Sequence, residues 1–429
     1  GWTRPPDLAL VQDPDAIALT LGLVVKETPF LFLMTLAALG QVDARRSILV
    51  ARSLGYRPAT AWLKVVWPRL YRQLRLPLFA VLAFCVSVVD MALILGPTAP
   101  PTLAVQITRW AGDPDPAVRA QGAAGAVLLL ALTLVAIAGW LAGERLLEAC
   151  LRGWRTGGGR GGGESPLRWI AGMAAALVVG AAWLALAGLA LWAVADAWRF
   201  PDPLPTAWSV RRLGEAVAGA WRPLATTLGI GAVAAAVALA LVVACLEHES
   251  RRRRPVQALW LLYLPLLVPQ LVFLYGVQQL LVRLGIDGSW LAVAWVHLLF
   301  VLPYVFLSLS DPWRALDERY RRSAQALGAS PGRVLRRITL PLLLRPVLVA
   351  LAVGFAVSVA QYLPTLFAGA GRVETLTTEA VALAAGGDRR VVAVHALLQA
   401  VLPFLGFAAA LALPGWLWRR RAGMRTLLR

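Results

Sequence analysis

Long apolar runs recur throughout this chain of 429 residues and constrain its fold more than any other feature. A segment that crosses the hydrocarbon of a bilayer must satisfy its own backbone hydrogen bonds, and an α-helix of about 20 apolar residues does so. Nine runs have this length and composition: residues 17–39, 76–95, 122–141, 169–194, 224–246, 256–282, 290–309, 347–367 and 391–416. Because 59% of the residues are hydrophobic, more than a soluble core needs, the sequence predicts an all-α polytopic membrane protein.

The net charge of +19 is spread unevenly over the segments that connect these runs. Lys and Arg gather on the cytoplasmic side of membrane proteins. If residues 41–75 lie inside, alternation places 30 of the 42 Lys and Arg residues on that side, including those of the C-terminal segment 417–429. One topology therefore accounts for the charge. A nucleic-acid-binding surface, which would interleave basic and aromatic side chains on a soluble face, is not predicted.

An internal repeat relates two of the connecting segments at an offset of 273 residues. Residues 51–72 align with residues 324–345 without a gap, and seven of the 22 positions are identical. The repeated Ala, Gly and Pro residues are Ala51 and Ala324, Gly55 and Gly328, Pro58 and Pro331, and Pro68 and Pro341. Each copy lies between two apolar runs, so the repeat predicts two homologous halves with one polar loop each.

The local pattern of each loop predicts two short helices. The residues before Gly55 or Gly328 favour a helix, and the Gly followed by a Pro three residues later indicates a turn. In the second copy Val334, Leu335 and Ile338 form an apolar stripe at helical spacing. Pro341 then stands where a new helix can begin.

A segment rich in Gly and Arg, residues 152–165, lies between the halves and has the composition of a flexible linker. No strand precedes it and no Lys-Ser/Thr follows, so phosphate binding is not expected. Six apolar runs follow the linker but three precede it, and three spans of the first half are predicted to be missing. The predicted divisions are a first half at 1–142, a linker at 143–168, a second half at 169–416 and a basic tail at 417–429.

The loops resemble the cytoplasmic signature of binding-protein-dependent ABC importer permeases, written Glu-Ala-Ala, three residues, Gly, nine residues, Ile, one residue, Leu-Pro. The matching positions are Ala324, Gly328, Ile338, Leu340 and Pro341 in the second copy, and Ala51, Gly55 and Pro68 in the first. Both copies lack the Glu, with Arg322 and Val50 near its position, which puts any ion pair of that Glu in doubt. The resemblance covers both halves and implies a type I importer fold with two fused permease halves.

This resemblance implies partners as well as a fold. In the family the loop forms a coupling helix that docks on a separate ATPase subunit, and a short rigid helix can carry a rigid-body motion into the spans. Two loops imply two ATPase contacts. A periplasmic binding protein is implied as the source of the solute. The residues implied in coupling are Ala51, Gly55, Pro58, Pro68, Ala324, Gly328, Pro331, Ile338, Leu340 and Pro341.

The chain is not expected to be an enzyme. Its two lysines, Lys26 and Lys64, do not stand in a Walker A setting, so ATP is expected to be bound by the partner subunits, with no cofactor or metal in this chain. The implied location is the bacterial inner membrane, with the loops and the C-terminus cytoplasmic. Residues 358–372 and 388–390 resemble permeases of thiamine transport systems, within the iron- and thiamine-type group of fused permeases.

Few polar residues stand inside the apolar runs, where they are expensive and usually face a pathway or a partner. Asp90 and Gln361 follow similar Val-Ser-Val sequences in the two halves, and paired positions in repeats suggest a translocation path. A hydrogen bond between helices is the alternative role. A charged Asp90 would favour a cationic solute, thiamine-like or a metal ion. His297 is expected to pack or to hydrogen-bond locally.

Two other classes of function remain as alternatives. A membrane enzyme would need a catalytic set of residues, and none can be assembled from the His and acidic residues near the spans. An ion-coupled secondary transporter with internal repeats also predicts similarity between halves. It does not predict Gly and Pro at these spacings in both polar loops.

Overall fold

Helix dominates the computed structural model, which describes residues 11–161, 165–198, 202–252, 265, 268–384, 386 and 388–417. Among these residues, seven helices are long and apolar enough to cross a membrane: Ile17–Gly40, Pro58–Ser87, Pro116–Thr156, Trp169–Val194, Trp221–Arg251, Trp290–Arg314 and Arg389–Leu417. The described strands form one hairpin, β1 (Ala195–Ala197) with β2 (Ala207–Trp208). The predicted all-α membrane fold is confirmed.

Two of the nine predicted runs are interrupted. The run at 76–95 breaks between α4 (Trp67–Ser87) and α5 (Asp90–Leu95). The run at 347–367 breaks between α17 (Leu344–Val359) and α18 (Leu363–Gly369). Much of the run at 256–282 lies outside the described residues. Most of its described part is in α12 (Gln270–Leu284), which has 15 residues, and Val268 and Pro269 just before α12 are not helical.

The first compact unit comprises Gly1–Gly188 with Leu267–Phe273. Its long helices are α1 (Ile17–Gln41), α4 and α7 (Pro116–Thr156), and α4 packs against both of the others. The shorter elements are α2 (Ala44–Ser53), α3 (Pro58–Ala61), the π-helical turn η1 (Trp62–Val66), α5 and α6 (Leu103–Ala111). The predicted boundary at 142–143 falls inside α7, so the beginning of the predicted linker is helical.

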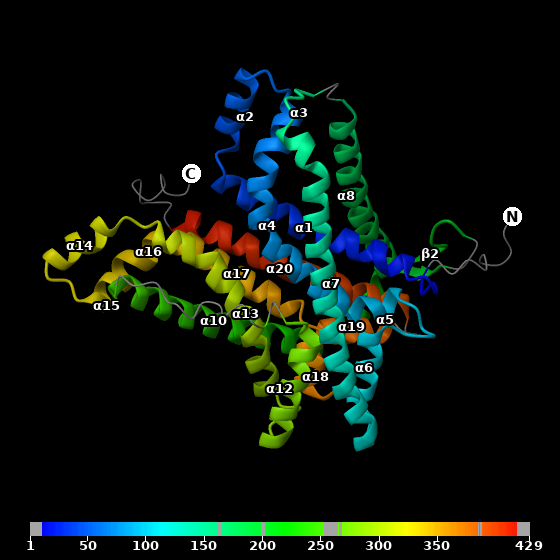
Figure 1. The fold of residues 1–429 in the computed structure, drawn as a ribbon. Coiled ribbons are helices and arrows are strands. Elements are labelled where there is room, and N and C mark those ends of the chain that lie inside the picture. Colours follow the sequence, from blue (N-terminus) through cyan, green and yellow to red (C-terminus); the bar gives the residue numbers. More distant parts are fainter. Residues whose placement is uncertain are drawn as a thin grey trace. The chain divides into compact units, whose positions relative to one another are not determined.

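The second compact unit comprises Leu189–Leu266 with Leu274–Arg429. Four helices pack side by side in it: α10 (Trp221–Arg252), α13 (Trp290–Arg314), α17 and α20 (Arg389–Leu417) (Figure 1). Small residues allow the close approach, because a Cβ on Gly231 would lie 2.9 Å from the Phe355 ring. The other elements are α8 (Ser165–Val194), which divides between the units, α9 (Val210–Gly219), α14 (Glu318–Ala326), α15 (Pro331–Val334), η2 (Leu335–Thr339), α16 (Leu340–Leu342) and α19 (Leu376–Ala384).

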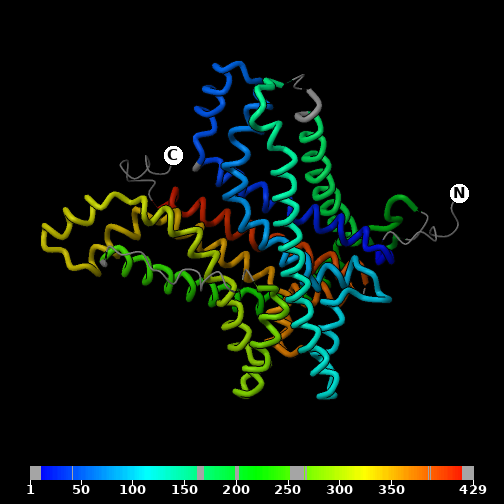
Figure 2. The backbone as a smooth tube through the Cα atoms, in the orientation of Figure 1, coloured from blue at the N-terminus to red at the C-terminus, as the bar shows by residue number. Residues whose placement is uncertain are grey.

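The helix bounds extend the repeat far beyond the 22 positions found in the sequence. At the offset of 273, both ends coincide for α1 and α13, α3 and α15, η1 and η2, and α6 and α19. The first residues coincide for α4 and α16, α5 and α18, and α7 and α20. Figure 2 traces one copy in blue to cyan and the other in yellow-green to red. The two copies therefore share one backbone design from the first residue of α1 and α13 onward.

Candidate functional site

The two polar loops are the first candidate site, and each contains the same turn. We call α2, α3 and η1 the first loop (44–66), and α14, α15 and η2 the second loop (318–339). Gly55 has φ 87° and Gly328 has φ 80°, a left-handed conformation that glycine adopts without steric cost. These glycines end α2 and α14, respectively.

The hydrogen bonds around each glycine form a Schellman cap. In the first loop the N–H of Tyr56 donates to the carbonyl of Ala51 at 3.1 Å, and the N–H of Gly55 donates to Arg52 at 2.9 Å. In the second loop the N–H of Ala329 donates to Ala324 at 3.0 Å, and that of Gly328 donates to Gln325 at 2.9 Å. Ala51 and Ala324 are buried. The repeated Ala and Gly thus occupy two defined positions of one helix cap.

The repeated prolines shape the helix that follows. Pro58 and Pro331 are the first residues of α3 and α15, where a missing N–H costs nothing. Upstream of Pro68 the helix widens, because the Trp67 N–H reaches back five residues to the Trp62 carbonyl. A proline ring clashes with the carbonyl four residues before it, and the wider turn relieves that clash. The same π-helical turn, η2, precedes Pro341.

The motif residues of the second loop face the interior of their unit. Val334 is buried, while Leu335 and Leu340 pack against the core of α10, α13 and α17. Ile338 and Pro341 are half-buried. The predicted apolar stripe is thereby confirmed, and it attaches the second loop to the helices.

Each loop also exposes a leucine that sequence reasoning missed. Leu54 and Leu327 precede the two glycines, and they are 60% and 89% exposed. Their identity in both copies was the available signal, since a large apolar side chain on a polar loop has no packing role there. Exposed apolar anchors of this kind are typical of surfaces that bind a partner.

Ion pairs join both α13 and the second loop to α10. Arg314 at the end of α13 pairs with Glu249 at 3.1 Å, and Arg321 of the second loop pairs with Glu247 at 3.5 Å. Arg321 also donates to the Ser250 hydroxyl at 2.6 Å. Arg322, near the position of the motif's absent Glu, pairs within its own helix with Glu318.

The two helix breaks are the second candidate site, because Asp90 and Gln361 lie at them. Asp90 is the first residue of α5 and is half-buried. Gln361 is buried in the break between α17 and α18, two residues before α18 begins. The register of the helices aligns Asp90 with Leu363 and Gln361 with Val88. The predicted pairing of Asp90 with Gln361 is therefore wrong by two residues, although both lie at the equivalent break.

A buried polar cluster surrounds the break in the second unit. His297 Nδ1 lies 2.8 Å from Ser358 Oγ, and its Nε2 lies 2.9 Å from Thr365 Oγ1. Gln361 Nε2 donates to the His297 carbonyl at 3.4 Å, and its Oε1 is buried without a hydrogen-bond partner. One imidazole thus links the last turn of α17 to the first turn of α18. The predicted local hydrogen bonding of His297 is confirmed.

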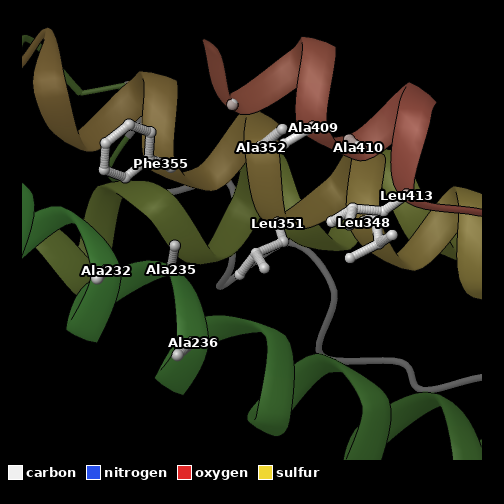
Figure 3. Close-up of a pocket in the computed structure, with 11 residues that line it drawn as sticks. Ala232, Ala235, Ala236, Leu348, Leu351, Ala352, Phe355, Ala409, Ala410 and Leu413 are labelled. Carbon is white, nitrogen blue, oxygen red and sulfur yellow. The ribbon is translucent and has the colours of Figure 1, made fainter. Parts of the chain in front are cut away.

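An apolar groove of about 400 Å³ lies between α10, α17 and α20, away from this cluster (Figure 3). Its lining is made of small and aliphatic residues with one aromatic, among them Ala235, Leu348, Leu351, Phe355 and Ala410. No lining side chain could pair with a charge, so the groove does not suit a charged solute. Among the described residues, no group of three His, Cys, Asp or Glu side chains could hold a metal ion.

Comparisons with known proteins agree with the loop signature. Residues 236–414 match the family of binding-protein-dependent transport system inner membrane components. Over 421 residues the chain is 37% identical to the inner membrane ABC transporter permease protein YnjC of Escherichia coli, covering 96% of this chain and 75% of that protein. The molybdenum transport system permease ModB of Mycobacterium tuberculosis is 34% identical over 33% of this chain and 57% of its own length.

A further relative is the spermidine/putrescine transport system permease PotC of Haemophilus influenzae, which is 26% identical over 31% of this chain and 51% of its own length. Such permeases are multi-pass proteins of the inner membrane that work with separate ATPase subunits and a binding protein. The extent of the match to the first of these relatives, together with the repeated loop geometry, shows that this chain belongs to the permease family of binding-protein-dependent ABC importers.

Proposed function

We propose that this chain is a fused, two-half permease in which the first and second loops each dock one ATPase subunit. The observation that carries the proposal is the shared backbone pattern of the two loops, from the Schellman cap at Gly55 and Gly328 to the π-helical turns before Pro68 and Pro341. A loop held at both ends moves as one body with its spans. Two such loops allow two ATPase contacts.

The residues proposed to act in coupling have distinct structural roles. Ala51, Gly55, Ala324 and Gly328 build the caps. The helical segment that follows each cap is shaped by Pro58, Pro68, Pro331, Ile338, Leu340 and Pro341. The exposed Leu54 and Leu327 are added as contacts with the ATPase. This arrangement requires the loops and the C-terminus to be cytoplasmic, with ATP bound by the partner subunits and no cofactor in this chain.

The Gly328 turn offers a sharp test, because a Cβ there would meet no described atom within 4 Å. Gly328→Ala therefore strains the backbone alone, by about 1–2 kcal/mol. Gly332→Ala is the matched control, since Gly332 lies in the same loop with open space and no positive φ. Co-purification with the ATPase subunit should weaken roughly 5- to 30-fold for Gly328→Ala and stay unchanged for Gly332→Ala. Equal behaviour of the two variants would count against the proposal.

We infer further that the helix breaks border the translocation path and that the solute is a small cation, thiamine-like or a metal ion. Asp90 supports this inference because it is half-buried at the break in the apolar run 76–95. The names of the relatives do not select the solute, since they include a molybdenum and a spermidine/putrescine permease. The family assignment favours ATP-driven import over the secondary-transport alternative.

Uptake by proteoliposomes tests the role of Asp90. Asp90→Asn keeps the size of the side chain and removes its charge, so uptake of a cationic solute should fall at least tenfold while ATPase association is retained. Asp15→Asn is the control, because it removes the same charge from an exposed position of the same unit. Unchanged uptake in Asp90→Asn would remove Asp90 from the path.

A further inference from the structure

The beginning of the linker contacts the first loop. Residues 157–161 follow α7 and lie along the loop, where the Arg57 N–H donates to the Arg160 carbonyl at 3.1 Å. The Lys64 ammonium donates to the carbonyls of Gly157 and Gly159 at 2.9 and 3.1 Å. Backbone and side chain therefore both attach the linker to this loop.

Lys64 acts as the clamp between them. Its ammonium lies 4.9 Å from the centre of the Trp154 ring on α7 and 5.5 Å from that of the Tyr56 ring in the first loop. Both rings attract the positive charge. Lys64 also caps the C-terminal end of α7, where positive charge is favourable. A single side chain thus joins the end of α7, the linker and the first loop.

The linker reaches the turn that the proposed function uses. A Cβ on Gly55 would lie 3.2 Å from Arg160 Cδ, whereas a Cβ on Gly328 would meet no described atom within 4 Å. The second loop carries exposed Arg333, Arg336 and Arg337, and the register places Thr60, Leu63 and Lys64 at these positions of the first loop.

The first loop thus lacks two of these three basic side chains and uses the third as a clamp. The adjoining segment 152–161 supplies three exposed arginines of its own: Arg152, Arg155 and Arg160. We propose that residues 152–161 complete the ATPase-docking surface of the first loop, an inference that rests on the proposed function. Their guanidinium groups replace those of the second loop, so that both loops offer a basic face around an exposed leucine to an acidic face of an ATPase subunit.

The test measures binding of the ATPase subunit to the full-length permease as a function of salt. One variant carries Arg152→Gln, Arg155→Gln and Arg160→Gln, and the second carries Arg333→Gln, Arg336→Gln and Arg337→Gln. A third, with Arg211→Gln, Arg222→Gln and Arg283→Gln, removes the same charge from exposed positions elsewhere. The first two should each weaken one of two binding events about tenfold at low salt, an effect that fades at high salt as screening grows. The third should bind like the wild type.

Lys64→Met decides whether the linker contributes to docking or hides the loop. Release of the linker should weaken binding of the ATPase subunit to the first loop about threefold. Stronger binding would mean that the linker covers the docking surface and would overturn the inference. Identical behaviour of the linker and control triples would also overturn it, while leaving the proposed function intact. If the wild type binds no ATPase subunit at any salt concentration, the proposed function fails as well.

Discussion

The two copies of the repeat share their helix bounds but place their polar side chains at different positions. In the first unit Glu144 on α7 pairs with Arg75 on α4 at 2.7 Å and hydrogen-bonds Tyr71, and Trp140 Nε1 donates to the Tyr71 hydroxyl at 2.9 Å. The register aligns these four residues with Leu344, Leu348, Leu413 and Leu417 of the second unit. One helix pair is held by charge and the other by apolar contact.

The two helix breaks differ in their polar side chains as well. The second unit has the His297 cluster at its helix break, whereas the equivalent residues of the first unit are Val24, Cys85, Val88 and Ala92. The first unit has Asp90 instead, where the second has Leu363. Gly and Pro therefore fix the shared backbone, and the remaining side chains are free to divide different tasks between the two copies.

The helix after the loop also differs, and a proline lies next to the difference. Pro58–Ser87 is one continuous helix, whereas Pro331–Leu342 and Leu344–Val359 meet at a bend of 79°. Pro346 lies four residues after Leu342, whose carbonyl its ring would meet in a continuous helix. The equivalent residue of the first unit is Gln73, which has an N–H to donate. Pro77 lies inside α4 without such a break, so Pro346 favours the bend at its own position and is not sufficient by itself.

Exchanging Gln73 and Pro346 between the two units should have the largest effect on stability. Gln73 is exposed in the interior of α4, so Gln73→Pro removes no packing but disrupts the helix, at a cost of about 3 kcal/mol or more. The apparent melting temperature in detergent should fall sharply. Pro346→Gln is the reciprocal control and should leave it nearly unchanged, because the bend already accommodates residue 346. An unaffected Gln73→Pro would show that the bend has another cause.

The Glu144 network offers the next largest effect. Glu144→Leu leaves Arg75 and Tyr71 without their acceptor, and the loss should be about 1–3 kcal/mol. Replacing Tyr71, Arg75 and Glu144 together by Leu, as in the second unit, should restore most of the stability, because the Trp140 N–H is then the one polar group of this network left without its partners. Glu148→Leu, one turn further along α7 and exposed, is the control. A triple variant less stable than Glu144→Leu would mean that the two units cannot exchange their modes of contact.

The sequence predicted the spans and the loops well, because both depend on local patterns. Long apolar runs require helices in a bilayer, and a Gly followed by a Pro punctuates a polar loop in only a few ways. It missed the breaks after Ser87 and Val359, since neither contains a proline or glycine and both lie within continuous apolar runs. Polar residues at those breaks, Ser87 and Asp90 in one and Ser358 and Gln361 in the other, were the local sign.

The candidate site could be predicted only where the repeat was visible. The repeated Ala, Gly and Pro residues located both loops, but the two-residue error in pairing Asp90 with Gln361 arose because the Val-Ser-Val sequences are too short to fix a register. The Lys64 clamp and the His297 cluster join residues between 61 and 95 positions apart. No spacing rule relates residues at such separations, so tertiary structure was needed to find them.

The ion pairs of the second loop give the smallest and most selective test of the comparison. Arg321 and Arg322 are neighbours on α14, but Arg321 is 16% exposed and pairs with Glu247 of α10, whereas Arg322 is 63% exposed and pairs within its own helix. Arg321→Met should lower the free energy of unfolding by about 1 kcal/mol and weaken the coupling of ATP hydrolysis to solute transport. Arg322→Met should change the free energy of unfolding by less than about 0.5 kcal/mol and leave the coupling unchanged. Since the first loop has Ile48 where Arg321 stands, Ile48→Met should have no effect on coupling. If Arg322→Met reduced stability and coupling as much as Arg321→Met, then the exposed surface of α14, and not its ion pair with α10, would be what coupling through the second loop requires.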